Sequence, residues 1–145
     1  KRDFKILNLE HKNDPNEIQV RAGHDAYLKN FGCIHNRSIT IDKINNKVIG
    51  QDKLTQKRVN SKIKYDIRFH LYPGLTAIQT IGGNTLLIQI NKNKALLFST
   101  NEKNLKIEKS IFFGGQKVLD NYCIVISGTM ENNEKTINWE IKKKI

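Results

Sequence analysis

The chain has 145 residues, 38% hydrophobic and 27% charged, which suits one soluble domain spanning residues 1–145. We find no apolar stretch long enough to span a membrane and no signal-peptide pattern at the N-terminus, which excludes an integral membrane protein. The chain opens with Lys1 and has no initiator Met, as expected for a chain that is processed, trimmed or cut out of something longer.

The chain is basic over its whole length. It has 25 Lys and Arg against 14 Asp and Glu, a net charge of +11. Residues 1–72 carry 15 basic and 8 acidic side chains (+7), and residues 73–145 carry 10 and 6 (+4). Such a field attracts nucleic acid, acidic polysaccharide or an anionic surface. The alternative is a genome rich in A and T, which favours Lys, Asn and Ile, together with Lys that protects sheet edges.

Alternation of apolar and polar side chains predicts strands throughout the chain. It begins at residues 18–22 and is longest over residues 63–71, where the odd positions are apolar and the even positions are polar. The same period recurs in four later windows, at residues 86–90, 105–113, 122–126 and 137–141. No window shows a helical stripe of comparable length. We expect the odd positions of residues 63–71, and Trp139, to lie in a core.

Turn residues separate these windows, as in the runs NDPN at 13–16, GGN at 82–84 and GG at 114–115. Their spacing predicts about ten or eleven short antiparallel strands in an all-β sandwich of two packed sheets. Residues 53–64 form the most basic stretch, and we expect them to be a loop before the strand at 63–71.

Cys33 and Cys123 lie far apart and lack the spacing of a metal site. Each precedes an isoleucine, which predicts two buried free thiols. A single disulfide is the alternative if the protein is exported.

Two basic pairs are candidates for binding an anionic substrate. His35 and Arg37 are two residues apart and therefore share one strand face, and so do Arg68 and His70. Arginine offers a bidentate fork for carboxylates and sulfates, and histidine offers a titratable donor. The alternative is that all four residues lie on solvated strand faces.

His24 and Tyr27 form a further candidate pair, for general acid and base catalysis, because they are three residues apart after a predicted strand. Their alternative is a structural turn in which Tyr27 covers the core. No local spacing of metal ligands occurs, so we expect no metal site in this segment. The remaining alternative is a site assembled from the distant His24, His35 and Asp52.

Four runs then match a known family in order: GHDAY at 23–27, FGCIHNR at 31–37, GQDKL at 50–54 and RFHLYPG at 68–74. They resemble the C-terminal β-domain of heparinase II/III-like polysaccharide lyases. The resemblance is specific over residues 20–75 and weaker beyond. The sequence departs from the family pattern at Ala26, where glycine is usual, and at Tyr72, where a second histidine is usual.

The resemblance implies a larger enzyme in which an N-terminal α/α toroid precedes β-sandwich material and cleaves uronate-containing polysaccharides by β-elimination. It also implies that the catalytic residues and a structural zinc site lie upstream, so this segment would support the toroid, bind substrate and hold no cofactor. The implied partners are an acidic polysaccharide and the toroid of the same polypeptide. The implied origin is a bacterium, with a periplasmic or secreted location if the lyase is exported.

Two other functions remain open. A basic β-sandwich of this kind could also be a non-catalytic module that binds acidic carbohydrate. A nucleic-acid-binding domain is disfavoured, because Tyr65 and Phe69 share the apolar face of their strand and are not interleaved with basic residues.

Overall fold

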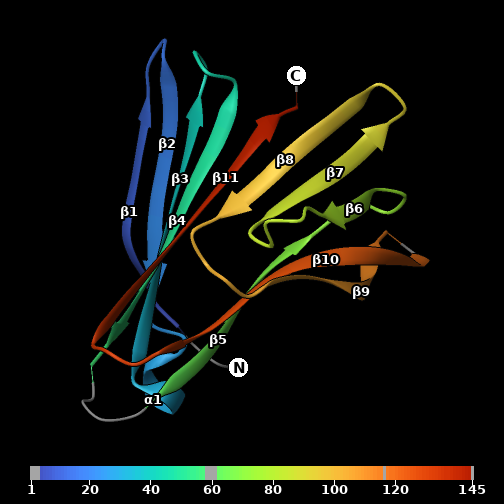
Figure 1. Ribbon diagram of the computed structural model, residues 1–145. Coiled ribbons are helices and arrows are strands. Elements are labelled where there is room, and N and C mark those ends of the chain that lie inside the picture. The colour runs from blue at the N-terminus through green and yellow to red at the C-terminus, as the bar shows by residue number, and fades with distance from the viewer. Residues whose placement is uncertain (1–3, 58–61, 116, 145) are drawn as a thin grey trace. The chain divides into compact units, whose positions relative to one another are not determined.

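The computed structural model describes residues 4–57, 62–115 and 117–144. Within these residues it contains eleven strands and one short helix, which confirms the all-β prediction (Figure 1). The elements, in chain order, are β1 (Ile6–Asn13), β2 (Glu17–His24), α1 (Leu28–Phe31), β3 (Cys33–Asp42), β4 (Lys47–Gln56), β5 (Ile63–His70), β6 (Thr76–Gln79), β7 (Thr85–Asn91), β8 (Lys94–Thr100), β9 (Leu105–Gly114), β10 (Lys117–Met130) and β11 (Glu134–Lys143).

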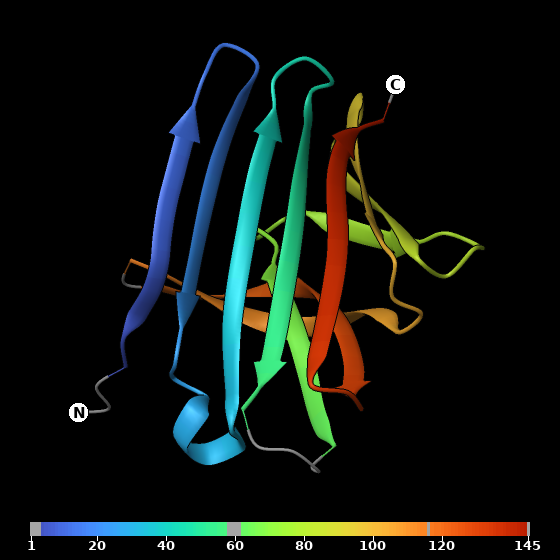
Figure 2. The ribbon, with the colours of Figure 1, turned by 90° about the vertical axis from the view of Figure 1, so that its left-hand side faces the viewer.

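The strands form two antiparallel sheets of eight and three strands, as expected for a sandwich. The chain divides into two compact units, residues 1–64 with 129–140 and residues 65–128 with 141–145. In the first unit β1, β2, β3, β4 and β11 lie side by side in that order (Figure 2). Long ladders join these strands, and ten residue pairs connect β3 to β4 without a register shift.

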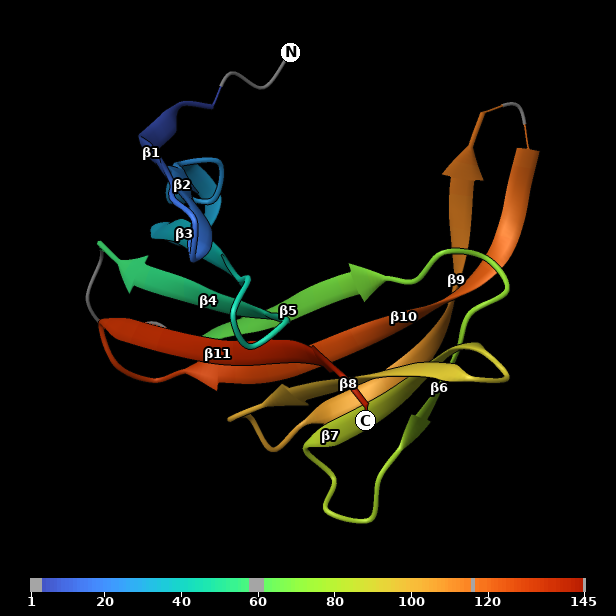
Figure 3. The same cartoon turned by 90° about the horizontal axis from the view of Figure 1, so that it is seen from above.

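The second unit contains β8, β7 and β6 in one row and β5, β10 and β9 in another. Strands β9 and β10 form a long antiparallel hairpin (Figure 3). Its register runs from the pair Lys117 and Gly114 to the pair Ile126 and Leu105. The turn at Gly115 has a φ of 63°, a conformation that glycine adopts without steric cost.

Each unit buries apolar side chains of its own. In the second unit the rings of Phe69 and Phe98 pack edge to face at 5.0 Å, beside the buried strand Cys123 to Ile126. The predicted alternation in β5 is confirmed, because the even positions are exposed and the odd positions are not. Ile67 and Leu71 are buried, and Ile63, Tyr65 and Phe69 are half-buried. In the first unit Trp139 is 5% exposed, which confirms its place in the core.

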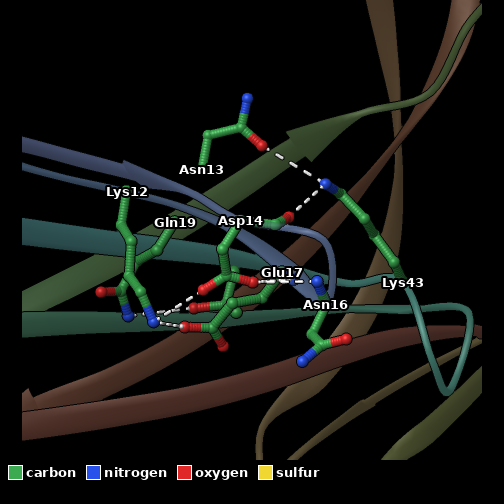
Figure 4. A network of polar contacts seen from close by, with 8 residues as sticks. Lys12, Asn13, Asp14, Asn16, Glu17, Gln19 and Lys43 are labelled. Carbon is green, nitrogen blue, oxygen red and sulfur yellow. Dashed lines mark hydrogen bonds and ion pairs between the residues drawn. The ribbon is translucent and has the colours of Figure 1, made fainter.

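The turn between β1 and β2 shows how one side chain fixes a hairpin (Figure 4). The Asp14 carboxylate accepts hydrogen bonds from the backbone N–H groups of Asn16 and Glu17, both at 2.9 Å, and Lys12 contacts it at 2.9 Å. Hydrogen bonds from Lys12 and from these backbone groups lower the pKa of Asp14 to about 2. Lys43 reaches across from the next turn to donate to the Asp14 backbone oxygen at 2.6 Å.

The expectation that residues 53–64 form a loop is wrong at its start. Strand β4 continues to Gln56, because Leu54 and Gln56 are buried and Gln56 pairs with Cys33 on β3. Residues 58–61 of that stretch lie outside the described residues. The short helix α1 ends at Phe31 and is followed by Gly32, whose φ of 64° is left-handed.

Both cysteines are buried and free, as predicted from their apolar neighbours. Burial raises the pKa of each thiol and keeps both protonated at neutral pH. Among the described residues no helix is long and apolar enough to cross a membrane.

Candidate functional site

A buried carboxylate, Asp52, lies at the centre of the first unit's polar cluster. Its side chain is 0% exposed and accepts four hydrogen bonds. His35 donates from Nε2 at 2.6 Å, Arg37 donates from Nε at 2.7 Å and from Nη2 at 3.2 Å, and Trp139 donates from Nε1 at 2.8 Å. A carboxylate with this many donors, one of them charged, can stay ionised without water.

The strand register explains how these groups meet. Arg37 on β3 lies directly opposite Asp52 on β4. His35 lies two residues before Arg37 on β3, so its side chain points to the same face of the sheet. Gly50 lies on the same face of β4 as Asp52. A Cβ atom at Gly50 would overlap the indole ring of Trp139, so the absence of a side chain there makes room for the tryptophan. In this Gly-Gln-Asp run, Gly50 therefore leaves room for the indole ring of Trp139, and Asp52 accepts a hydrogen bond from the indole N–H group.

Burial by itself would raise the pKa of Asp52, but hydrogen bonds from His35 and Arg37, the Arg37 charge and the Trp139 hydrogen bond outweigh it. The pKa of Asp52 therefore lies below its ordinary value. The Arg37 charge offsets the carboxylate charge, and its guanidinium carbon lies 6.0 Å from the centre of the Trp139 ring.

A second histidine extends the cluster toward the surface. His24 Nε2 lies 3.1 Å from His35 Nδ1, and the backbone N–H of Ala26 points at His24 Nδ1 from 3.3 Å. Because Ala26 donates to Nδ1, neutral His24 carries its proton on Nε2 and donates to His35, which in turn donates to Asp52. Burial first, and then the neighbouring His35, lower the pKa of His24 and favour this neutral state.

The structure brings His24 and Tyr27 together, with ring centres 5.1 Å apart. However, both ring nitrogens of His24 already have hydrogen-bond partners, Ala26 and His35. Tyr27 is 46% exposed. This geometry does not favour the catalytic assignment, which stays a prediction. Ala26 has no positive φ, so alanine at this position causes no backbone strain.

His24, His35 and Asp52, the residues considered for a metal site, also meet. They form a chain of direct hydrogen bonds, and the 2.6 Å between His35 Nε2 and Asp52 Oδ1 leaves no space for an ion between these atoms. In the parts of the chain that the structure describes, no group of three His, Cys, Asp or Glu side chains has the arrangement of a metal site.

The second predicted pair, Arg68 and His70, belongs to the second unit. Arg68 donates to Glu108 at 2.7 Å and to Asp66 at 2.8 Å, and Lys106 contacts Glu108 at 2.6 Å. The positive charges of Arg68 and Lys106 are thus balanced by the negative charges of Asp66 and Glu108. His70 Nδ1 lies 3.4 Å from Ser110 Oγ. Arg68 is thus already paired with carboxylates, and binding of an external anion would have to compete with them.

Sequence reasoning found His35 and Arg37 but missed that Asp52 holds them. It considered Asp52 only as a possible metal ligand. The available signal was its inward position on β4, between Gly50 and Leu54, where a charged side chain needs buried partners.

The sequence profile of the family described as Heparinase II/III-like, C-terminal, matches residues 3–140. No curated protein matches the chain. Heparan sulfate lyase HepC from Pedobacter heparinus has a similar fold, with a TM-score of 0.79, 11% identity and 96% of this chain covered. A structure of heparinase III matches with a TM-score of 0.66, 13% identity and 97% coverage. The chain spans 22% and 21% of these two proteins, respectively. The family match over nearly its whole length shows that this chain belongs to the heparinase II/III-like C-terminal family.

Proposed function

We propose that this domain is the β-sandwich part of a lyase that cleaves uronate-containing acidic polysaccharides by β-elimination. Its role is to support the toroid and to contribute to substrate binding. The observation that carries the proposal is the family match over residues 3–140. The net charge of +11 supports it, because an acidic polysaccharide is attracted to a basic surface.

Arg37 is the residue best placed to bind a substrate anion. Its side chain is 35% exposed, while two of its nitrogens are fixed by Asp52 on the neighbouring strand. A guanidinium held in this way loses less conformational entropy on binding than a long side chain at a strand end. His35 acts through Asp52, since both of its ring nitrogens are engaged, and it is a positioning residue.

Arg68 and His70 are proposed as weaker contributors. The two carboxylates that hold Arg68 keep it extended but also compete with a substrate anion for its donors. Chemistry on the polysaccharide needs a neutralised uronate, a base and an acid. In this proposal residues outside the segment supply these groups.

The proposal is tested with the purified 145-residue chain. Calorimetric titration with heparan sulfate should show weak binding that falls at least tenfold between 50 and 200 mM salt, because counterions compete with surface charge pairs. A neutral glucan of the same length should not bind. An assay for unsaturated uronate should show no product. Absence of heparan sulfate binding at low salt would contradict the binding role. Formation of unsaturated product would contradict the proposal that residues outside this segment supply the catalytic groups.

A further inference from the structure

The face of β2, β3 and β4 opposite Asp52 carries polar side chains that no function above uses. Side chains alternate between the two faces of a strand, so residues 36 and 38 lie on the face opposite His35 and Arg37. Nine residues line an open depression of about 400 Å³ in the first unit, and Asn8, Glu10 and Arg37 are among them. We call the other six the polar shelf: Arg21, Asn36, Ser38, Gln51, Lys53 and Thr55.

The register arranges the shelf in rows. Ser38 on the central strand β3 lies between Arg21 on β2 and Gln51 on β4. In the next row Asn36 lies beside Lys53. The two cations therefore flank β3 at a lateral separation of two strand spacings, about 10 Å. Hydroxyl and carboxamide groups fill the space between the two positive charges.

Gly23 on β2 leaves room for the Asn36 side chain of the shelf. Gly23 pairs with Asn36, and a Cβ atom at residue 23 would overlap the Asn36 carboxamide. The carboxamide thus lies close to the backbone of β2 at Gly23. Among the described residues, the side chains of Asn36 and Ser38 form no hydrogen bond within the protein, so their donors and acceptors are available to a ligand.

The shelf cations have weak internal partners. Lys53 contacts Glu134 at 3.0 Å, but the two side chains are 42% and 55% exposed. Arg21 lies 3.9 Å from Glu10, where both side chains are more than half exposed. Ion pairs this exposed contribute little free energy and can be exchanged for a ligand anion.

We propose that the polar shelf is a second binding site for an acidic oligosaccharide. Two anionic groups of the ligand contact Arg21 and Lys53, and hydroxyl groups between them hydrogen-bond to Asn36 and Ser38. No aromatic ring among the described residues lines the depression, so recognition uses charge and hydrogen bonds and not stacking. This inference rests on the proposed function, and it assigns a different face of the sheet.

The test titrates the 145-residue chain with a heparin hexasaccharide at 150 mM salt. The double variant Arg21→Gln/Lys53→Gln should lose at least tenfold in affinity. The charge-matched control Lys92→Gln/Lys94→Gln, in the β7 to β8 hairpin, should lose less than twofold. Equal losses in the two double variants would mean that only net charge matters and would overturn the site.

A substitution that leaves the net charge unchanged tests whether the shelf contributes to binding by more than its charge. Asn36→Ala should weaken hexasaccharide binding at least threefold, whereas Asn93→Ala in the β7 to β8 hairpin should leave it unchanged. Full affinity in Asn36→Ala would overturn the hydrogen-bonding part of the proposal. Far-ultraviolet circular dichroism should show that each variant keeps the wild-type strand content.

The same titration distinguishes the two proposals. No binding by the wild-type chain even at 50 mM salt would overturn both the proposed function and the shelf site. Binding that Arg37→Ala weakens and that Arg21→Gln/Lys53→Gln leaves unchanged would remove the shelf alone. The latter outcome would also fit a shelf that packs against another part of a longer polypeptide.

Discussion

Replacing Asp52 with asparagine should destabilise the domain, because it removes the charge that four hydrogen bonds converge on. If the new carboxamide oxygen keeps the place facing His35 and Arg37 Nε, its NH₂ group faces the indole N–H of Trp139. That buried donor then lacks an acceptor, at a cost of about 1–3 kcal/mol. Losing the charge-assisted bonds to Arg37 adds about 1.5–3 kcal/mol.

The cost is reduced because Arg37 is 35% exposed and can turn toward water. We therefore expect Asp52→Asn to lower the free energy of unfolding by about 3 kcal/mol. Urea unfolding can be followed by the fluorescence of Trp139, since the chain has one tryptophan, and by circular dichroism. Asp120→Asn, at an exposed carboxylate, is the matched control and should stay within about 0.5 kcal/mol of wild type.

The pH dependence gives a second readout of the same substitution. The pKa of Asp52 in the folded chain lies below its ordinary value of 3.8. Its stabilising contribution is therefore present above pH 3.8 and is lost as the pH falls through the folded pKa. The wild-type chain should lose more stability than Asp52→Asn over this acid range. An Asp52→Asn variant as stable as wild type at pH 7 would refute the description of Asp52 as the centre of the cluster.

Three further results are expected. Gly50→Ala should cost about 3 kcal/mol in urea unfolding, because the Trp139 ring must leave its place; a loss below about 1 kcal/mol would show that the ring relaxes easily. Gly128→Ala should cost less, about 1–2 kcal/mol, because it meets mainly the outer end of the Tyr65 side chain, which can swing aside. The urea midpoint should begin to fall below pH 6.5, since the pKa of His24 in the folded chain is lower than this ordinary value. His24→Gln should flatten that dependence, and an unchanged pH profile would contradict the role given to this histidine.

The strands could be predicted because they are local patterns. In β5 every second side chain is apolar, and a period of two is enough to identify the strand and its inward face. Glycine and asparagine marked most of the hairpins for the same reason. The predicted windows did not cover β1, β4, β6 or β8. In β4, Lys53 and Gln56 are polar, and their pairing with β3 is not visible in a local window.

The polar cluster was only partly predictable because its contacts are non-local. The pair His35 and Arg37 is readable from spacing, but Asp52 and Trp139 are 87 residues apart in the chain. No local pattern states that an indole N–H will meet a carboxylate. Similarly, Arg68 is an exposed cation in the sequence, and only the fold shows that Glu108, 40 residues away, is its partner.

The most direct test of the proposed binding role compares Arg37→Ala with Lys143→Ala in a heparan sulfate titration at moderate salt. Both variants remove one positive charge, but Arg37 is held by Asp52 and Lys143 lies exposed near the end of β11. The proposal predicts at least a fivefold larger loss of affinity for Arg37→Ala, because a guanidinium group that is already held in place loses less entropy per contact. Asp52→Asn should weaken binding in the same direction, since it removes the carboxylate that holds this group. Equal losses for Arg37→Ala and Lys143→Ala would contradict the proposal and leave net charge as the only determinant.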